Sequence, residues 1–134
     1  MNRLPKRAVV YDTGALLAAD RGDDRFQVLH LCCLRQDVTP VVPAPVLAQV
    51  WRGGTRQARL SKALQGCTVE PTSEVTARNA GVLLGRGRSS DAVDAIVVAT
   101  ALAHDALIVT SDPQDIALLW GASGTRSKLA VLAV

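Results

Sequence analysis

Short apolar runs alternate with longer stretches of helical period along the chain. The runs predict strands at Ala8–Tyr11, Val38–Val42, Cys67–Glu70, Ala106–Thr110 and Leu129–Val134. The stretches between them predict helices at Thr13–Asp20, Asp23–Gln36, Ala44–Trp51, Thr55–Gln65, Thr72 to about Leu84, Ser90–His104 and Pro113–Trp120. This alternation predicts βαβ units, and therefore an α/β fold whose parallel sheet carries helices on both faces.

Length and composition narrow this picture to one compact domain. A chain of 134 residues can build one real core but not two, so we expect a single domain over residues 1–134. Hydrophobic residues make up 49% of the chain and aromatic residues only 3%, which predicts a core of alanine, valine and leucine. The net charge of +3 permits contact with nucleic acid without requiring it.

The cysteines and the first residues indicate a cytoplasmic protein. Cys32, Cys33 and Cys67 are odd in number and lack the spacing of paired metal ligands, so we interpret them as reduced core thiols. The start, MNRLPKRAVVYD, has too short an apolar run for a signal peptide. The longest apolar run, Ala95–Ala103, is far too short to span a membrane, so no membrane partner is expected.

Several aspartates stand where predicted elements begin or end. Asp12 and Asp112 directly follow predicted strands, whereas Asp91 and Asp94 open the most apolar helix. Taken singly, helix capping explains Asp12 and Asp112, and the helix dipole explains Asp91. The helix dipole explains Asp94 less well, because this carboxylate lies among apolar neighbours in a helix that is apolar nearly all round. Such a helix is buried, and a buried carboxylate needs a partner.

Together these four aspartates predict a metal site. If the strands that precede Asp12 and Asp112 are neighbours in the sheet, all four carboxylates meet at one edge. Their mutual repulsion would raise their pKa values unless a cation lay among them. Oxygen ligands suit Mg²⁺ or Mn²⁺, and the chain has no cluster of histidine or cysteine to favour zinc. An acidic metal pocket of this kind suits phosphoryl chemistry.

Three stretches resemble the PIN-domain family, and within it the VapC-like toxins: VVYDTGALLAA, VVPAPVLAQVWR and SSDAVDAIVVATALAHDALIVTSDPQDI. The resemblance implies a three-layer α/β/α sandwich and Mg²⁺- or Mn²⁺-dependent endonucleolytic cleavage of RNA. It also implies a homodimer held by a cognate antitoxin. The implied metal and catalytic carboxylates are Asp12, Asp91, Asp94 and Asp112, and the implied supporting hydroxyls are Thr13 and either Thr110 or Ser111.

One residue departs from the family pattern. The family usually has a glutamate in the middle helix, where this chain has Gln49. An amide oxygen can contact a metal ion or its bound water, but it brings no negative charge. We therefore expect Gln49 to support the site indirectly, and one ion to bind more weakly.

Basic and aromatic residues offer candidates for substrate contact. We expect Arg52, Arg86 and Arg88 to bind RNA phosphates, since guanidinium groups suit phosphate. A basic stripe of Arg56, Arg59 and Lys62 is explained as well by a solvated helix face. Trp51 and Trp120 are expected at an interface or in the core rather than stacked on bases, and His30 and His104 are expected away from the carboxylates.

Two alternatives to a ribonuclease toxin stay open. A PIN-like module weakened in catalysis by Gln49 could bind RNA or a protein partner. A phosphotransfer protein also places an aspartate after a parallel strand. Against the second alternative, there is no second aspartate two residues after Asp12 and no lysine at the end of a strand.

Overall fold

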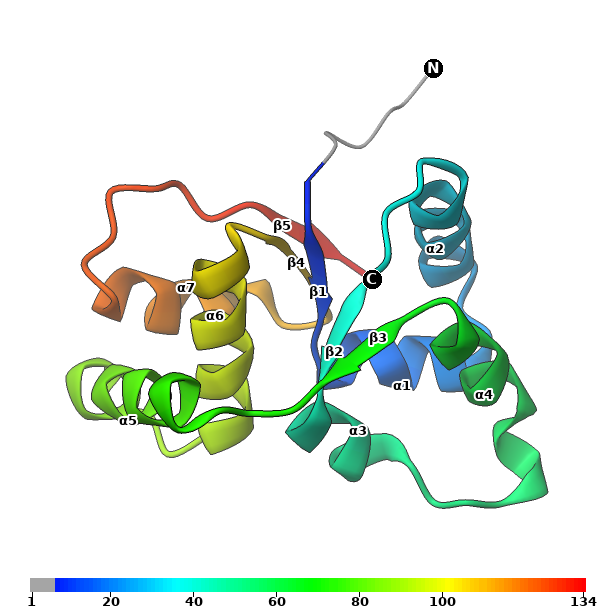
Figure 1. Ribbon diagram of the computed structural model, residues 1–134, viewed down its shortest axis with the longest axis horizontal. Coiled ribbons are helices and arrows are strands. Elements are labelled where there is room, and N and C mark those ends of the chain that lie inside the picture. The colour runs from blue at the N-terminus through cyan, green and yellow to red at the C-terminus, as the bar shows by residue number, and fades with distance from the viewer. Residues whose placement is uncertain (1–6) are drawn as a thin grey trace.

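The sheet is parallel throughout and reverses its strand order beside the first strand. The computed structural model describes residues 7–134 (Figure 1), so Met1 to Lys6 of the N-terminal stretch considered above lie outside the described residues. Five strands pair in the order β3-β2-β1-β4-β5, and every neighbouring pair is parallel. Their bounds are β1 Val9–Tyr11, β2 Val41–Pro43, β3 Thr68–Glu70, β4 Leu107–Thr110 and β5 Val131–Ala133.

Helices cover both faces of this sheet, which confirms the predicted α/β/α sandwich. The α-helices are α1 Thr13–Arg21, α2 Asp24–Arg35, α3 Ala44–Val50, α4 Ala58–Gln65, α5 Glu74–Gly87, α6 Ala92–His104 and α7 Pro113–Ala122. Figure 1 shows α5, α6 and α7 on one side of the sheet and α1, α2 and α4 on the other. None of the helices in the described part of the chain is long and apolar enough to cross a membrane.

The core lies along the two central strands. Every residue of β1 and β4 is buried, whereas the edge strand β3 is largely exposed. Strands covered by helices on both faces must be apolar throughout, which is why these two read as continuous apolar runs. Of the three cysteines, Cys33 is buried while Cys32 and Cys67 are only half-buried, so the core interpretation holds fully for Cys33 alone.

Several predicted boundaries were wrong because tertiary contacts shift them. The helix expected from Thr55 starts as a 3₁₀ turn, Thr55–Gln57, and becomes α-helical only at Ala58. The reason is the Gln57 side chain, which turns inward to accept from the Arg52 N–H and donate to the Val50 carbonyl, both at 2.8 Å.

The other shifts have similar causes. The strand expected from Val38 begins at Val41, because the Val38 N–H donates to the Cys33 carbonyl at the end of α2. Helix α5 was expected from Thr72 but begins at Glu74, with Ser73 as its N-cap. It runs past Leu84 to Gly87, where the chain packs against α7.

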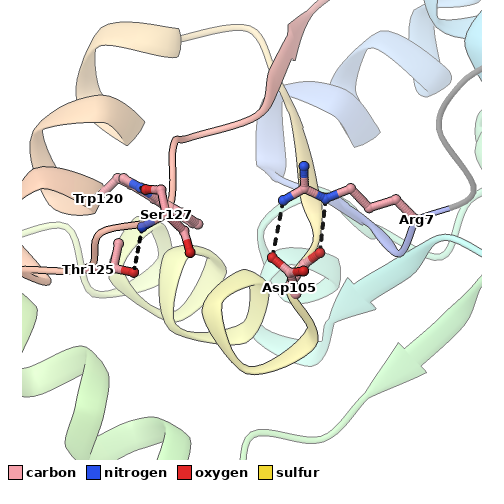
Figure 2. Close-up of polar contacts among 5 residues, drawn as sticks. All are labelled: Arg7, Asp105, Trp120, Thr125 and Ser127. Atoms are coloured by element: carbon pink, nitrogen blue, oxygen red, sulfur yellow. Dashed lines mark hydrogen bonds and ion pairs between the residues drawn. The ribbon is translucent and has the colours of Figure 1, made fainter.

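The segment that leads into β5 is anchored by Trp120. The indole N–H of this residue donates to the Ser127 carbonyl at 3.0 Å, and the Ser127 N–H donates to the Thr125 hydroxyl at 3.2 Å (Figure 2). Trp120 is 6% exposed and belongs to the core. Just before β1 and β4, the Arg7 guanidinium donates to the backbone carbonyl and the carboxylate of Asp105 at 3.0 and 3.2 Å (Figure 2).

Candidate active site

The sheet order places the switch point between β1 and β4. The chain builds β1, β2 and β3 outward in one direction and then returns to place β4 on the other side of β1. In open parallel sheets, ligands bind beyond the carboxyl ends of the strands at such a point. The residues that follow β1 and β4 are therefore the first candidates for a site.

Asp12 follows β1 and is held firmly in place. Its carboxylate caps α1 by accepting from the Ala15 N–H at 2.9 Å, and its own N–H donates to the Val109 carbonyl in β4 at 3.1 Å. The side chain is 4% exposed. Burial raises its pKa above the usual value of 3.8, and hydrogen bonds from Thr110 and backbone N–H groups offset this only in part.

The Thr110 hydroxyl links the ends of the two strands. It accepts from the Asp112 N–H at 2.9 Å and donates to the Asp12 carboxylate, a bond that lowers the pKa of Asp12. Thr110 is completely buried. One hydroxyl thus aligns Asp12 with the turn that carries Asp112, which selects Thr110 over Ser111 as the side chain in contact with these carboxylate positions.

Ser111 has a different place, packed against Gly14. A Cβ added at Gly14 would lie 2.0 Å from the Ser111 Oγ and 2.9 Å from its backbone nitrogen. The turns after β1 and β4 can approach this closely only because position 14 has no side chain. Gly14 is therefore required for the two turns to meet.

The first turn of α6 brings two more carboxylates. Asp91 is the N-cap of α6, and its carboxylate accepts from the Asp94 N–H at 3.0 Å. Asp94 is half-buried, and burial is the main cause that raises its pKa to about 7. The charges of Asp91, Asp12 and Asp115 raise it further, which places Asp94 within the electrostatic reach of all three.

Asp115 is a carboxylate of this site that the sequence analysis missed. Asp112 caps α7 and accepts from the Asp115 N–H at 3.4 Å. A hydrogen bond to Asp112, together with the charges of Asp112 and Asp91, raises the pKa of Asp115. The signal was present, since Asp112 and Asp115 repeat the three-residue spacing of Asp91 and Asp94. We call Asp12, Asp91, Asp94, Asp112 and Asp115 the carboxylate cluster.

Gln49 lies against the first turn of α1. The Thr13 hydroxyl donates a short hydrogen bond to the Gln49 amide oxygen. Because Thr13 directly follows Asp12, this bond places the end of α3 beside the carboxylate cluster. Gln49 is exposed, so it lines the opening of the site rather than its base.

The three arginines expected to bind RNA lie at the ends of two helices, α3 and α5. The Arg52 guanidinium donates to the carbonyls of Trp51 and Gln49 at 2.8 and 2.9 Å, and so caps the end of α3. Arg86 and Arg88 are exposed at the end of α5, where Gly87 packs against the second half of α7. Within residues 7–134, neither Arg86 nor Arg88 forms an ion pair.

Both histidines have partners elsewhere, as expected. His30 Nδ1 lies 2.7 Å from the Tyr11 hydroxyl, and His104 Nε2 lies 2.6 Å from the Glu70 carboxylate. Burial lowers the pKa of His30. Neither histidine is among the groups that shift the pKa values of Asp12, Asp94 or Asp115.

The carboxylate cluster contains the ligand type that divalent metals prefer, but its side chains are not arranged around one position. Within residues 7–134, no three His, Cys, Asp or Glu side chains are arranged to hold a metal ion. The ligand chemistry nevertheless fits Mg²⁺ or Mn²⁺, which bind carboxylate oxygens. Asp12, Asp91 and Asp112 each accept a helix-capping N–H through one carboxylate oxygen. Asp12 also accepts from the Thr110 hydroxyl, whereas Asp91 and Asp112 are exposed to a ligand.

Solved structures share this fold. A VapBC2 complex from Rickettsia felis, bound to a DNA fragment from its promoter, matches with a TM-score of 0.72 and 16% identity over 95% of this chain and 98% of that one. A toxin–antitoxin complex from Klebsiella pneumoniae matches with a TM-score of 0.67 and 19% identity, over 82% and 91%. FitAcB from Neisseria gonorrhoeae matches with a TM-score of 0.61 and 17% identity, over 92% of this chain and 95% of that one.

The sequence itself identifies the family. No curated protein matches the chain. Residues 9–117, from the start of β1 to the middle of α7, match the family described as PIN domain. This stretch contains the whole carboxylate cluster and the Thr13–Gln49 contact. The family match also leaves no ground for the phosphotransfer alternative, and the chain belongs to the PIN-domain family.

Proposed function

We propose that this PIN-domain protein is a divalent-metal-dependent endoribonuclease and the toxin of a type II toxin–antitoxin pair. The observation that carries the proposal is the set of carboxylates that the sheet order and the helix caps bring together at the switch point between β1 and β4. Burial and the charges of Asp91, Asp12 and Asp115 raise the pKa of Asp94 to about 7 there. Carboxylates crowded in this way favour either a bound proton or a bound cation. A divalent cation is the choice that supports phosphodiester hydrolysis.

Four side chains would hold the ion: Asp12, Asp91, Asp94 and Asp112. When bound, Mg²⁺ or Mn²⁺ supplies an activated water and stabilises the charge that develops on the phosphate. Asp12 is oriented by the Ala15 N–H and the Thr110 hydroxyl, so it offers a preorganised oxygen. Asp91 and Asp94 lie together at the start of α6.

Gln49 and Asp115 modify this site. Thr13 fixes the Gln49 amide at the opening, where it supplies polar contact without charge. Asp115 lies in the first turn of α7 beside Asp112 and adds the negative charge that Gln49 lacks. We propose that one ion binds and that Gln49 acts indirectly.

The partners follow from the same proposal. The neighbours in structure come from complexes described as toxin–antitoxin, VapBC2 and FitAcB. We propose an antitoxin partner for this chain, a homodimer, RNA as substrate and the cytoplasm as its location. Arg86 and Arg88 are better candidates for phosphate contact than Arg52, because the Arg52 guanidinium is already bonded to backbone carbonyls.

Cleavage of bacterial RNA tests the enzyme directly. The purified chain is incubated with total RNA in Mn²⁺, Mg²⁺ or EDTA, beside Asp94→Asn and the control Asp24→Asn. Asp24 is the first residue of α2, on the face of the sheet opposite α6 (Figure 1), and is exposed. We expect metal-dependent cleavage that falls by about 100-fold or more in Asp94→Asn and stays unchanged in Asp24→Asn. A folded chain that cleaves nothing in either metal would refute the nuclease.

The uncharged Gln49, at the position where the family usually has glutamate, favours a second candidate function. The chain would then be a PIN module that is weakened in catalysis and binds RNA or a protein. The Gln49→Glu variant separates the two. A large gain of cleavage over the unmodified chain would favour the weakened module, whereas similar cleavage by both would favour the enzyme.

A further inference from the structure

A cluster of three rings joins helix α2 to the end of strand β1. The ring centroids of Tyr11 and Phe26 are 5.2 Å apart in an edge-on contact, and Phe26 is stacked on the His30 imidazole at 5.3 Å. Tyr11 is the last residue of β1, whereas Phe26 and His30 lie four residues apart on one face of α2. Tyr11 is completely buried and Phe26 is 2% exposed. We call Tyr11, Phe26 and His30 the ring cluster.

Hydrogen bonds fix the orientation of the His30 imidazole. His30 donates to the backbone carbonyl of Ala63, in α4, and its Nδ1 lies 2.7 Å from the Tyr11 hydroxyl. Since Nδ1 faces the hydroxyl, the nitrogen that donates to Ala63 is Nε2, and Nδ1 is left to accept from the Tyr11 O–H. Burial lowers the pKa of His30 below its usual value of 6.5, so the imidazole is neutral at pH 7, as this arrangement requires. The Cys33 thiol also hydrogen-bonds with the Tyr11 hydroxyl, but sulfur is a weak partner, which leaves His30 as the main acceptor.

The Tyr11 side chain anchors the end of the strand that leads into Asp12. Asp12 directly follows Tyr11, and its N–H donates to the Val109 carbonyl of β4. Within residues 7–134, β1 is in register with β4 at three positions, Tyr11 included, but with β2 at Val10 alone. The backbone at Tyr11 is therefore paired with a strand on the β4 side only. Its buried side chain supplies the second anchor, because α2 holds both the ring and the hydroxyl.

Two sets of contacts therefore hold Asp12. The Ala15 N–H and the Thr110 hydroxyl bind its carboxylate directly. The ring cluster acts on the preceding residue and fixes the backbone from which that carboxylate extends. Residues that orient a metal ligand without touching the ion commonly change its affinity, because a ligand fixed in advance loses less conformational freedom on binding.

We propose that His30 is a positioning residue for the candidate metal site, since it holds Tyr11 and, through Tyr11, the backbone of Asp12. This role requires no contact of the imidazole with an ion or a substrate. The inference rests on the proposed function, because it concerns the same metal site, but the effect on Asp12 can be measured without metal. The other histidine serves as the comparison: His104 Nε2 lies 2.6 Å from the Glu70 carboxylate and joins α6 to the edge strand β3.

Hydrogen exchange of the metal-free protein tests the effect on Asp12. Two amides report on it, the Asp12 N–H, bonded to β4, and the Ala15 N–H, bonded to the Asp12 carboxylate. His30→Leu should speed exchange of both by about tenfold or more relative to the amides of α5, which lies on the other side of the sheet (Figure 1). His30→Asn has nearly the same shape as His30→Leu but keeps an oxygen near the Nδ1 position, so exchange should return to within about twofold of the unmodified chain. His104→Leu should leave both amides unchanged.

Calorimetry of Mn²⁺ binding measures the consequence for the site. His30→Leu and Tyr11→Phe should each lower Mn²⁺ affinity by about fivefold, and the double variant should bind no more weakly than the weaker single variant, because both changes break one contact. His30→Asn should restore the affinity, and His104→Leu should not change it. Tyr11→Phe keeps the ring and removes one oxygen, so it tests the same contact if His30→Leu does not fold.

Unchanged exchange of the Asp12 and Ala15 amides in His30→Leu would overturn the inference. So would a lower free energy of unfolding in His30→Leu with unchanged Mn²⁺ affinity, because His30 would then be structural only. A loss of affinity that His30→Asn does not restore would assign the effect to ring packing with Phe26 and overturn the role of the hydrogen bond. If the unmodified chain binds no Mn²⁺ while the exchange differences appear, the proposed metal-dependent function is refuted and His30 remains the residue that fixes Asp12.

Discussion

Two regions of the candidate active site are built in opposite ways. The β1–β4 junction, made of Asp12, Gly14, Thr110 and Ser111, joins two strand ends by close contact and hydrogen bonds; its Asp12 and Thr110 are buried. The helix entrances, made of Asp91, Asp94, Asp112 and Asp115 in the first turns of α6 and α7, are more open. Asp91, Asp112 and Asp115 are exposed there, and Asp94 is half-buried.

This difference separates positioning from charge. In the junction, hydrogen bonds from Thr110 and Ala15 partly offset the effect of burial on Asp12 and hold its carboxylate in place. At the helix entrances, repulsion between neighbours is not offset by any cationic side chain among the causes that raise the pKa of Asp94 and Asp115. We infer that the junction would fix the position of a ligand and that the helix entrances would supply the charge that attracts it.

The largest effect is expected where the junction is tightest. Gly14→Ala would force a Cβ against Ser111 and should lower the free energy of unfolding by about 2–3 kcal/mol, measured by urea denaturation. The matched control is Gly81→Ala in α5, which has open space around its Cβ and should stabilise the protein by about 0.5–1 kcal/mol. Equal effects of the two changes would mean that the turns are not in close contact.

The next effect comes from the hydroxyl that links the two strands. Thr110→Val removes the acceptor of the Asp112 N–H and one of the donors to the buried Asp12 carboxylate, which keeps the Ala15 N–H. We expect a loss of about 1–3 kcal/mol in unfolding free energy. Ser111→Ala, the adjacent hydroxyl, should change it by less than about 0.5 kcal/mol. If Ser111→Ala proved the more damaging, our assignment of Thr110 as the link would be wrong.

At the helix entrances, stability should depend on pH rather than on close packing. The pKa of Asp94 rises from 3.8 to about 7 on folding, so the folded chain binds this proton more tightly than the unfolded chain does. The resulting stability is complete below about pH 4 and is lost as pH rises through about 7. Since half of the group faces solvent, screening limits the loss to about 1–2 kcal/mol.

Thermal unfolding of the metal-free protein between pH 4 and pH 8 measures this loss. Asp94→Asn should flatten the profile, and Asp24→Asn should leave it unchanged. Mn²⁺ should restore stability at pH 8, where the carboxylate is free to bind it. An unaltered profile in Asp94→Asn would remove Asp94 as its cause.

The smallest effect is expected at the opening of the site. Gln49→Glu keeps an oxygen that accepts from Thr13 and adds one negative charge. Mn²⁺ affinity measured by calorimetry should rise by about fivefold, equivalent to about 1 kcal/mol. Unchanged affinity would mean that Gln49 is outside the metal site.

Local patterns in the sequence were sufficient for the elements and for most of the carboxylates. Apolar runs located β1 and β4 because both faces of these strands are buried, and burial on both sides leaves a continuous apolar signal. Asp12, Asp91 and Asp112 were visible because each caps a helix, which is a local event between residues three apart. The family resemblance then ordered these pieces into one fold.

Only the tertiary structure decided which of these residues act together. Strand order brings Asp12 next to the turn with Asp112, although 100 residues separate them in the chain. Arg52 proved to cap α3, and the two tryptophans proved to differ in exposure, because both depend on what packs around them. The physical reason is that periodicity and capping act over one or two helical turns, whereas contacts between distant segments form only when the core closes.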